Sequence, residues 1–179
     1  MAIKTASGSG LTNSLSSGLV LLNTTSFSGV ASTSLTTDTF NSAYTNYRIL
    51  IRVTNTTAGD MQYRFRTAGS DDTNSNYNSQ FLVADSTTVS GGRSTNSNVG
   101  LIGYLPSTET SFFDLTIFSP KTSSRTAVQS FQSRAHGGTS VTIQHHFSNF
   151  NNTTSFDSMT FIPQTGAITG TYSVYGFNI

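Results

Sequence analysis

The chain contains no cysteine among its 179 residues. Disulfides, reactive thiolates and cysteine-based zinc sites are therefore excluded together. The same absence leaves the redox compartment of the protein undetermined, because a cysteine-free chain is compatible with oxidising and reducing surroundings alike.

Charged side chains are scarce as well. They make up 9% of the chain, with a formal net charge of +1, against about 25% in an average globular protein. Glu109 is the single glutamate, and Lys4 and Lys121 are the only lysines. Because such residues cover the solvent-facing surfaces of helices, their scarcity excludes a helical bundle. No run of like charges occurs, which excludes an acidic or basic interaction tail and argues against a nucleic-acid partner.

Long apolar runs are also missing. Residues 1–4 are followed by Thr, Ser and Gly, whereas a secretory signal needs an apolar stretch of about 7–15 residues. The longest early apolar run, residues 19–22, is far shorter than the roughly 20 residues that span a bilayer as a helix. We therefore expect a protein that is made and soluble in a cytoplasm and that has no membrane partner.

Small polar residues dominate what is present, with 29 Ser, 30 Thr and 14 Asn. Disordered chains share such a composition, but 13 Phe and 7 Tyr argue for a packed core. The Ser/Gly/Thr-rich residues 1–18 are predicted to form an extended N-terminal arm, and residues 19–179 a single domain. The isolated apolar residues of the arm are candidate contacts with a neighbouring subunit: Ile3, Leu11 and Leu15.

From residue 19 onward the dominant period is two, which is the pattern of β-strands. About nine or ten short strands follow at the spacing that is typical of a sandwich. Residues 77–84 and 87–90 are two of these strands, and the polar residues 69–76 and 91–98 are predicted to be loops. So many antiparallel strands must close or stack to hide their edges. We therefore predict an all-β, antiparallel, jelly-roll-like sandwich of about eight core strands.

Residues 47–53 and 61–65 give the clearest alternation of apolar and polar side chains. A turn joins them, so the pair is predicted to be a hairpin with an apolar inner face. Arginines fall on the outer face, where they are candidate subunit contacts, since arginine is enriched in protein interfaces. A plain solvated surface and a phosphate-binding patch are the alternatives. The four arginines are Arg48, Arg52, Arg64 and Arg66.

Two patterns invite a metal interpretation. His145 and His146 are adjacent, so on a strand they point to opposite faces and cannot share one ion; we expect His145 to be half-buried and His146 exposed. Asp72 begins the D-x-N-x-N spacing of a calcium loop, but Tyr77 stands where that loop needs glycine. The EF-hand interpretation therefore fails, and a different, weak calcium contact through Asp71 or Asp72 stays open. No metal site is predicted.

Catalytic patterns are equally weak. Glycoside hydrolysis needs two carboxylates across a cleft, and the nearest candidates, Glu109 and Asp114, lie on a loop and on a strand face. The chain has neither the G-x-S-x-G elbow of serine hydrolases nor a phosphate-binding G-x-x-x-x-G-K-[ST] loop. We expect a protein that is not an enzyme and that carries no cofactor.

Several segments together resemble a known group of proteins. They are residues 19–22, 25–28, 40–49, 63–77 and 170–177. In their order and in their strand and turn residues these segments look like the small structural virion proteins of tailed bacteriophages, including cyanophages. The resemblance covers most of the chain after residue 18. It implies membership of a phage particle, assembled in the host cytoplasm, and it identifies no active site.

Within a particle, two positions are open. The first is a head decoration, or cement, protein, a homo-oligomer with a trimer favoured, which stabilises the capsid through contacts with the major capsid protein. The second is a tail-fibre or receptor-binding module, which contacts tail components and reads host surface glycans through its loops. The candidate glycan contacts in that alternative are amide, carboxylate and aromatic side chains: Asp71, Asp72, Asn74, Asn76, Tyr77 and Tyr104.

Overall fold

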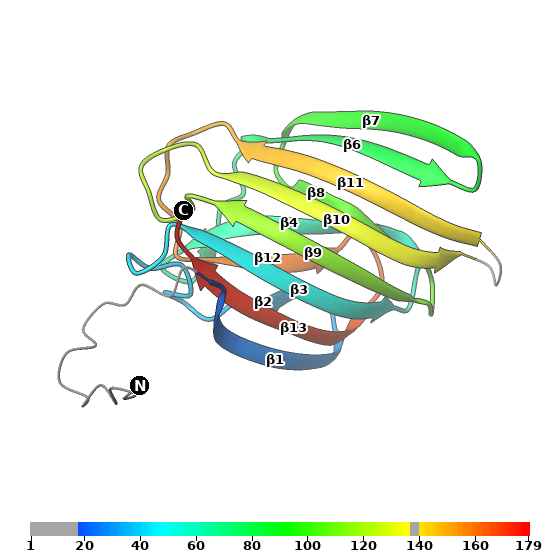
Figure 1. Cartoon of the computed structure of the whole chain (residues 1–179), viewed down its shortest axis with the longest axis horizontal. Coiled ribbons are helices and arrows are strands. Elements are labelled where there is room, and N and C mark those ends of the chain that lie inside the picture. The colour runs from blue at the N-terminus through cyan, green and yellow to red at the C-terminus, as the bar shows by residue number, and fades with distance from the viewer. Residues whose placement is uncertain (1–17, 137–139) are drawn as a thin grey trace, which may run out of the picture.

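The computed structural model describes residues 18–136 and 140–179. The predicted arm, with Ile3, Leu11 and Leu15, therefore lies outside the described residues. Within the described ranges the chain forms two antiparallel sheets that pack face to face, a large one in front and a small one behind (Figure 1). This confirms the predicted all-β sandwich; a jelly-roll path through its strands stays a prediction. Among the described residues, no helix is long and apolar enough to cross a membrane.

The large sheet has eight strands, which run from β1 at one edge to β7 at the other. In spatial order they are β1 (Val20–Val30), β13 (Ile168–Phe177), β3 (Asn46–Asn55), β9 (Thr110–Phe118), β10 (Ala127–His136), β11 (Ser140–Phe150), β6 (Tyr77–Asp85) and β7 (Thr88–Ser97).

The small sheet is built around β4, which pairs with β12 along one edge and with β5 and β8 along the other. Its strands are β2 (Thr33–Ser34), β12 (Ser158–Pro163), β4 (Gly59–Thr67), β5 (Ser70–Asp71) and β8 (Gly100–Leu105).

The predicted hairpin of residues 47–53 and 61–65 is wrong. β3 lies between β13 and β9 in the large sheet, whereas β4 belongs to the small one. The turn between them therefore carries the chain from one sheet to the other. Their apolar faces were correctly assigned, because each faces the space between the sheets and both are buried. Alternation fixes which face of a strand is inside, but not which strand lies beside it.

The predicted loop at residues 91–98 is also wrong, since β7 continues through Gly91 and Gly92 to Ser97. Glycine is uncommon inside strands, but here Gly92 lies directly opposite Phe81 of β6. A Cβ at Gly92 would stand 2.6 Å from Cζ of the Phe81 ring. The ring thus covers the glycine backbone, and this packing keeps the segment in the sheet.

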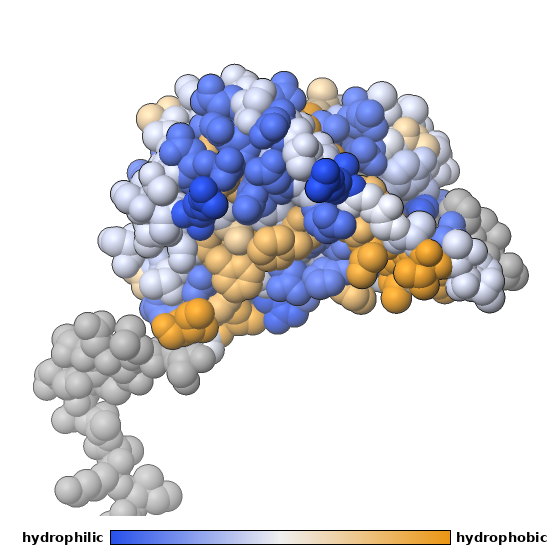
Figure 2. All heavy atoms as spheres, turned by 90° about the horizontal axis from the view of Figure 1, so that it is seen from above, coloured by the Kyte–Doolittle hydropathy of each residue, from blue (hydrophilic) through white to orange (hydrophobic). Residues whose placement is uncertain are grey.

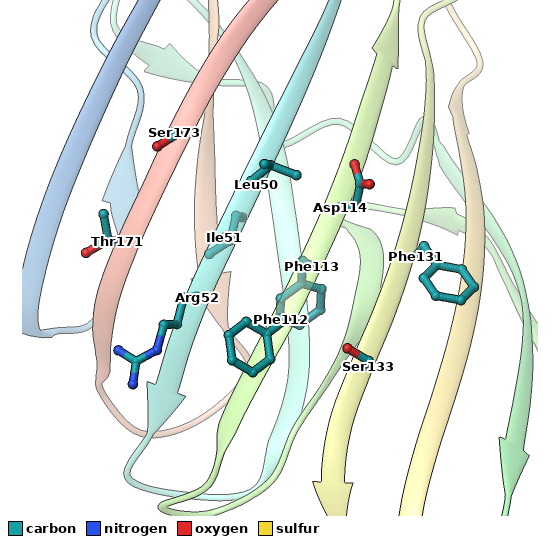
Figure 3. Close-up of a pocket in the computed structure, with 10 residues that line it drawn as sticks. All are labelled: Leu50, Ile51, Arg52, Phe112, Phe113, Asp114, Phe131, Ser133, Thr171 and Ser173. Carbon is teal, nitrogen blue, oxygen red and sulfur yellow. The ribbon is translucent and has the colours of Figure 1, made fainter. Parts of the chain in front are cut away.

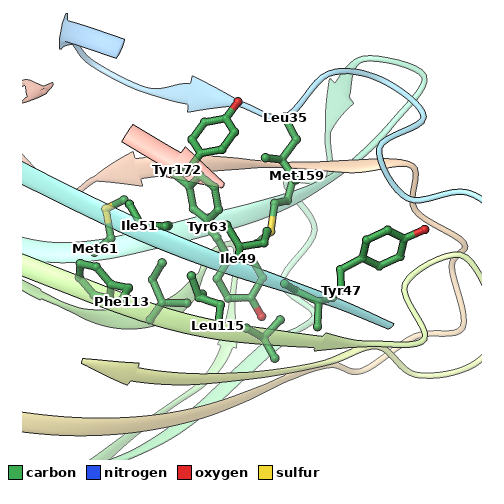
Figure 4. Close-up of a cluster of buried hydrophobic side chains, with 14 of the residues drawn as sticks. Leu35, Tyr47, Ile49, Ile51, Met61, Tyr63, Phe113, Leu115, Met159 and Tyr172 are labelled. Atoms are coloured by element: carbon green, nitrogen blue, oxygen red, sulfur yellow. The ribbon is translucent and has the colours of Figure 1, made fainter. Parts of the chain in front are cut away.

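Aromatic and aliphatic side chains of both sheets fill the space between them (Figure 4). Phe65 of β4 is fully buried and stacks on Phe156 with ring centroids 4.6 Å apart. Edge-on contacts of Phe65 and Phe156 with Phe150 continue this aromatic cluster into the large sheet. Burial of so many rings is the main source of stability in a chain with few charges.

One part of the inner surface is polar rather than apolar, and β8 explains why. The edge of β8 that is not paired with β4 faces side chains of the large sheet. Ser130 Oγ donates to the carbonyl of Ile102 at 2.6 Å, and the N–H of Tyr104 donates to Gln132 Oε1 at 2.9 Å. The Gln132 amide also donates to the Tyr104 carbonyl. Buried backbone groups need such partners, so serine and glutamine are placed here in the core.

The same arrangement continues at Leu101. Its N–H donates to Ser79 Oγ at 3.1 Å, and its carbonyl accepts from Ser148 Oγ at 3.0 Å. The two hydroxyl groups are 2.8 Å apart. Strands β6, β10 and β11 thus turn their polar side chains inward, toward β8.

Candidate functional site

The outward face of the same strands is apolar, and it is the most unusual surface of the molecule. On β11 the inward residues are polar, and the outward Val141, Ile143 and Phe147 are 66%, 46% and 51% exposed. On β10, Phe131 is 50% exposed and Ser130 next to it is buried. Because polar side chains are needed at β8, the apolar side chains of these strands have no place except the outside.

Eight exposed apolar side chains on the outer face of the large sheet form what we call the outer apolar patch. They are Leu50, Leu82, Val89, Phe112, Phe131, Val141, Ile143 and Phe147.

The strand register makes the patch continuous. Phe131 lies opposite His145, which in turn lies opposite Leu82, and the Phe131 and His145 rings are 6.2 Å apart. In the next row, Phe112 and Ile143 both lie opposite Ser133. Outward side chains of neighbouring strands stand about 5 Å apart on such a face, so these residues form one surface. Figure 2 shows apolar side chains gathered in its lower half, on the side of the large sheet's outer face.

The size of the patch decides how it is interpreted. Taking roughly 150–200 Å² for each fully exposed side chain, the eight exposed fractions correspond to roughly 650–850 Å² of surface. The largest apolar patch of a typical monomer covers about 300–600 Å². A standard protein interface buries about 800 Å² on each partner. The outer apolar patch is thus larger than the usual patch of a monomer and comparable in area to one side of a subunit interface.

A groove of about 510 Å³ crosses this face between β13 and β10. Figure 3 shows Leu50, Phe112 and Phe131 around it, with Arg52 and Asp114 beside them. Asp114 is held by Arg48, whose Nε donates to Asp114 Oδ1 at 2.8 Å. This hydrogen bond to Asp114 is the main reason that the pKa of Arg48 is raised. The groove therefore has an apolar floor. The charge of Asp114 at its side is neutralised by Arg48, and Arg52 is an exposed cation beside it.

The structure separates the four arginines that the sequence placed together. Arg48 and Arg52 lie on the outward face of the large sheet, and Arg64 and Arg66 on that of the small sheet. Arg64 donates to the carbonyl of Asn98 at 3.0 Å, and Arg66 pairs with Asp71 at 3.1 Å. The prediction of one arginine patch was wrong because it depended on the hairpin. That each arginine contacts another subunit stays a prediction.

Most polar groups of the predicted glycan-contact loop form hydrogen bonds with groups of the protein itself. Asp71 accepts from Thr160 Oγ1 at 2.6 Å, and Asp72 Oδ1 accepts from the N–H of Asn74 at 2.9 Å. The N–H of Asn76 donates to the Asn74 carbonyl at 2.8 Å. Asn74 keeps an exposed side chain. The loop is therefore an Asx turn of the kind that such residues form.

Tyr77 is not a surface residue, which corrects its prediction as a sugar contact. It is fully buried, its hydroxyl donates to the Asp72 carbonyl at 3.0 Å, and it accepts from the N–H of Phe65 at 2.9 Å. Burial raises the pKa of its hydroxyl above the ordinary value. Its position at the end of a polar loop made it look exposed in the sequence. Tyr104 is partly buried and lies away from this loop. The guanidinium of Arg134 lies over its ring, with Cζ 4.9 Å from the ring centre.

The two adjacent histidines point to opposite faces, as expected, but their environments are reversed. His145 is exposed in the outer apolar patch, whereas His146 is 4% exposed and faces inward. The apolar neighbours of His145 suggested an inside position, and on β11 those neighbours are outside. Within residues 18–136 and 140–179, no three His, Cys, Asp or Glu side chains are grouped so that they hold a metal ion.

Comparison of the chain with known protein families, with curated proteins and with solved structures finds no match.

Proposed function

We propose that the protein is a non-enzymatic structural component of a bacteriophage particle, most specifically a head decoration protein. In this proposal it forms a homo-oligomer, with a trimer favoured, through the outer apolar patch. The oligomer then stabilises the capsid by contacts with the major capsid protein. It is assembled in the host cytoplasm and functions in the virion.

The outer apolar patch is the observation that carries the proposal. A soluble domain with this area of apolar surface gains stability by burying it against another protein. The patch includes Phe131 and Ile143, with Arg48 beside Phe131 and Arg93 in the row of Phe147 as polar neighbours at its rim. Apolar centres with polar rims that contain arginine are typical of subunit interfaces.

The resemblance of the sequence to small phage virion proteins is our reason for proposing that the assembly is a phage particle. The composition agrees with it, since many strands and few charges suit a chain that is stabilised by assembly. The tail-fibre alternative rested on sugar contacts in loops, and Tyr77 and residues 91–97 are now known to be core and strand. Decoration of the head is therefore the stronger of the two proposals.

Light scattering on the purified chain tests the interface. We expect the molar mass of the wild-type protein to be a single whole-number multiple, greater than one, of the 19.1 kDa chain mass. Replacing Phe131 and Phe147 by serine is expected to shift it to the monomer mass, because both rings lie in the patch. Leu21→Ser is the matched control, since Leu21 is 56% exposed on β1, at the far edge of the sheet. A wild-type monomer, or equal masses for wild type and the double variant, would contradict the proposed interface.

Labelling of phage particles with an antibody to this chain, viewed by electron microscopy, tests the location. Label over the head is expected. Label at the tail tip would favour the receptor-binding alternative, and unlabelled particles would contradict virion membership.

Deletion of residues 2–17 tests the arm. It is expected to leave a folded domain that no longer joins particles, and normal incorporation of this variant would refute a role for the arm.

A further inference from the structure

The groove on the outer face of the large sheet has the dimensions of a binding site for a small molecule. Its volume of about 510 Å³ lies within the range of about 300–1,000 Å³ that is typical of ligand pockets. The groove crosses the neighbouring strands β13, β3, β9 and β10. Adjacent strands lie about 4.8 Å apart, so it extends for about 15 Å, which is half the thickness of the hydrocarbon core of a bilayer and thus about the length of one acyl chain.

Three exposed apolar side chains line this groove: Leu50 of β3, Phe112 of β9 and Phe131 of β10. Asp114 lies opposite both Leu50 and Phe131, and Phe112 is two residues from Asp114 on the same strand. Phe112 is therefore a diagonal neighbour of the other two on one face of the sheet. A flexible acyl chain that lies across these side chains removes their apolar surface from water, which is favourable.

The β13 side of the groove carries a free positive charge. Arg52 is exposed, and within residues 18–136 and 140–179 it forms no ion pair. Arg48, by contrast, donates to both carboxylate oxygens of Asp114. Arg52 lies opposite Thr171 of β13, and Figure 3 shows both residues on the other side of the groove from Phe131. The groove is therefore apolar at one end and positively charged at the other.

Thr171 adds a hydrogen-bond donor beside this charge. Its Oγ1 lies 3.2 Å from Ser26 Oγ of β1. Two hydroxyl groups that share one hydrogen bond keep a second O–H between them, which is available to another acceptor. A guanidinium and a hydroxyl group are suitable donors for a carboxylate, and the hydrogen bonds of a guanidinium to a carboxylate are charge-assisted.

This distribution of charge selects among ligand classes. A cationic amphiphile would be repelled by Arg52, and Asp114 would attract it little because Arg48 already neutralises that carboxylate. A neutral apolar molecule would leave Arg52 unused. A nucleic acid would meet one free cation and an apolar floor, whereas its binding depends on many phosphate contacts. One carboxylate at the end of one acyl chain matches both ends of the groove.

We propose that the outer groove binds a carboxylate of the fatty-acid class, with its acyl chain over Leu50, Phe112 and Phe131 and its carboxylate at Arg52. This inference goes beyond the proposed function and does not rest on it. Because the groove is part of the outer apolar patch, the ligand and a neighbouring subunit would compete for it. The mass of the ligand-free protein therefore tests the interface, whereas the dependence of ligand binding on Arg52 tests this site.

Nuclear magnetic resonance on the isotope-labelled full-length chain tests the site, with decanoate below its micelle concentration as the probe. Saturable shifts are expected for the amide signals of Leu50, Arg52 and Phe112. Val89 is the internal control, because it is 71% exposed in the outer apolar patch but lies outside the groove. Absence of saturable shifts would overturn the proposal. Equal shifts at Val89 would also overturn it, because they indicate unspecific adsorption to the whole patch.

A matched pair of arginine variants tests the carboxylate end. Arg52→Gln is expected to bind decanoate about fivefold more weakly, as for loss of one partly exposed ion pair, and to bind decanol as wild type does. Arg93→Gln is the control, since Arg93 is exposed on the same face but lies outside the groove. It should leave both affinities unchanged. Equal decanoate affinities of wild type and Arg52→Gln would overturn the assignment.

Two other occupants of the groove predict different results. The titration is repeated with the chain that lacks residues 2–17 and with Phe147→Ser, because Phe147 lies in the outer apolar patch but outside the groove. Shifts that appear only without residues 2–17 would assign the groove to that segment. Shifts that appear only in Phe147→Ser would assign it to a second copy of the chain. Either result would overturn the proposal, whereas shifts in all three proteins support it.

Discussion

The buried ring of His146 makes a specific prediction about stability and pH. In the folded protein its pKa is lowered from 6.5 to about 4, mainly by burial. In the unfolded chain the same ring titrates near its ordinary pKa. As the pH falls below about 6.5, the unfolded state binds a proton that the folded state refuses. The free energy of unfolding should therefore be at its full value above about pH 7 and should decrease as the pH falls toward 4.

The size of the effect follows from the two pKa values. Each unit of difference corresponds to about 1.4 kcal/mol, so the complete loss is about 3 kcal/mol. Between pH 7.5 and pH 5, where the titration is only partly complete, we expect a loss of about 2 kcal/mol. His145 on the same strand is the second cause of the lowered pKa of His146, and Asp60 and Arg134 line the same hollow between the sheets as His146. The raised pKa of Asp60 acts in the opposite direction, because the folded protein takes up this proton at a higher pH than the unfolded chain does.

Urea unfolding at several pH values, for wild type and His146→Gln, provides the assay. The variant lacks the titrating group, so the difference between the two proteins isolates its contribution and cancels all other groups. This difference is expected to change by about 2 kcal/mol between pH 7.5 and pH 5. His145→Gln is the control: it keeps the buried His146 and removes only the smaller contribution of His145 to its pKa, so it should stay close to wild type. Parallel curves for wild type and His146→Gln would refute the reasoning.

Three substitutions test other parts of the structure. Phe65→Ala and Phe161→Ala remove fully buried rings and should each cost about 3–5 kcal/mol in denaturant unfolding; a loss below about 1 kcal/mol would contradict their place in the core. Gln132→Ala should cost about 2–4 kcal/mol, because it leaves the N–H and carbonyl of Tyr104 without their partner. Hydrogen exchange at the Tyr104 amide should be faster in this variant, and unchanged protection there would show that Gln132 does not hold β8.

The sequence predicted strand faces well where a strand follows the usual rule. In β3 and β4 the alternating apolar residues, such as Ile49 and Tyr63, are indeed inside. The choice of partner strands was not predictable, because alternation contains no information about neighbours. Gly92 was mistaken for a loop residue because its reason for being in a strand, the Phe81 ring, lies on another strand.

The candidate site was hidden for a related reason. Phe147 and Ile143 alternate with polar residues, and the usual rule assigns such apolar residues to the interior. That rule fails on β11 because the inward Ser148 is required by the backbone of β8. Only the position of β8 reveals this requirement, so the outward apolar surface could not be derived from the pattern of β11 alone.

The side chains that meet β8 also have a consequence for how the chain selects its alignment. A strand held only by backbone ladders can slide by two residues with little change in its hydrogen bonds, which makes register errors a hazard of antiparallel sheets. β8 already has an irregular alignment with β4 between Met61 and Gln62. Ser130 and Gln132 recognise particular positions of β8, and Gly103 allows the close approach, since a Cβ there would lie 2.3 Å from Gln132 Oε1. A misaligned β8 would lose its hydrogen bonds to Ser130 and Gln132. It would also place a residue with a side chain at the position of Gly103, where that side chain would clash with Gln132. The polar core therefore destabilises wrong alignments of β8 and favours the native one.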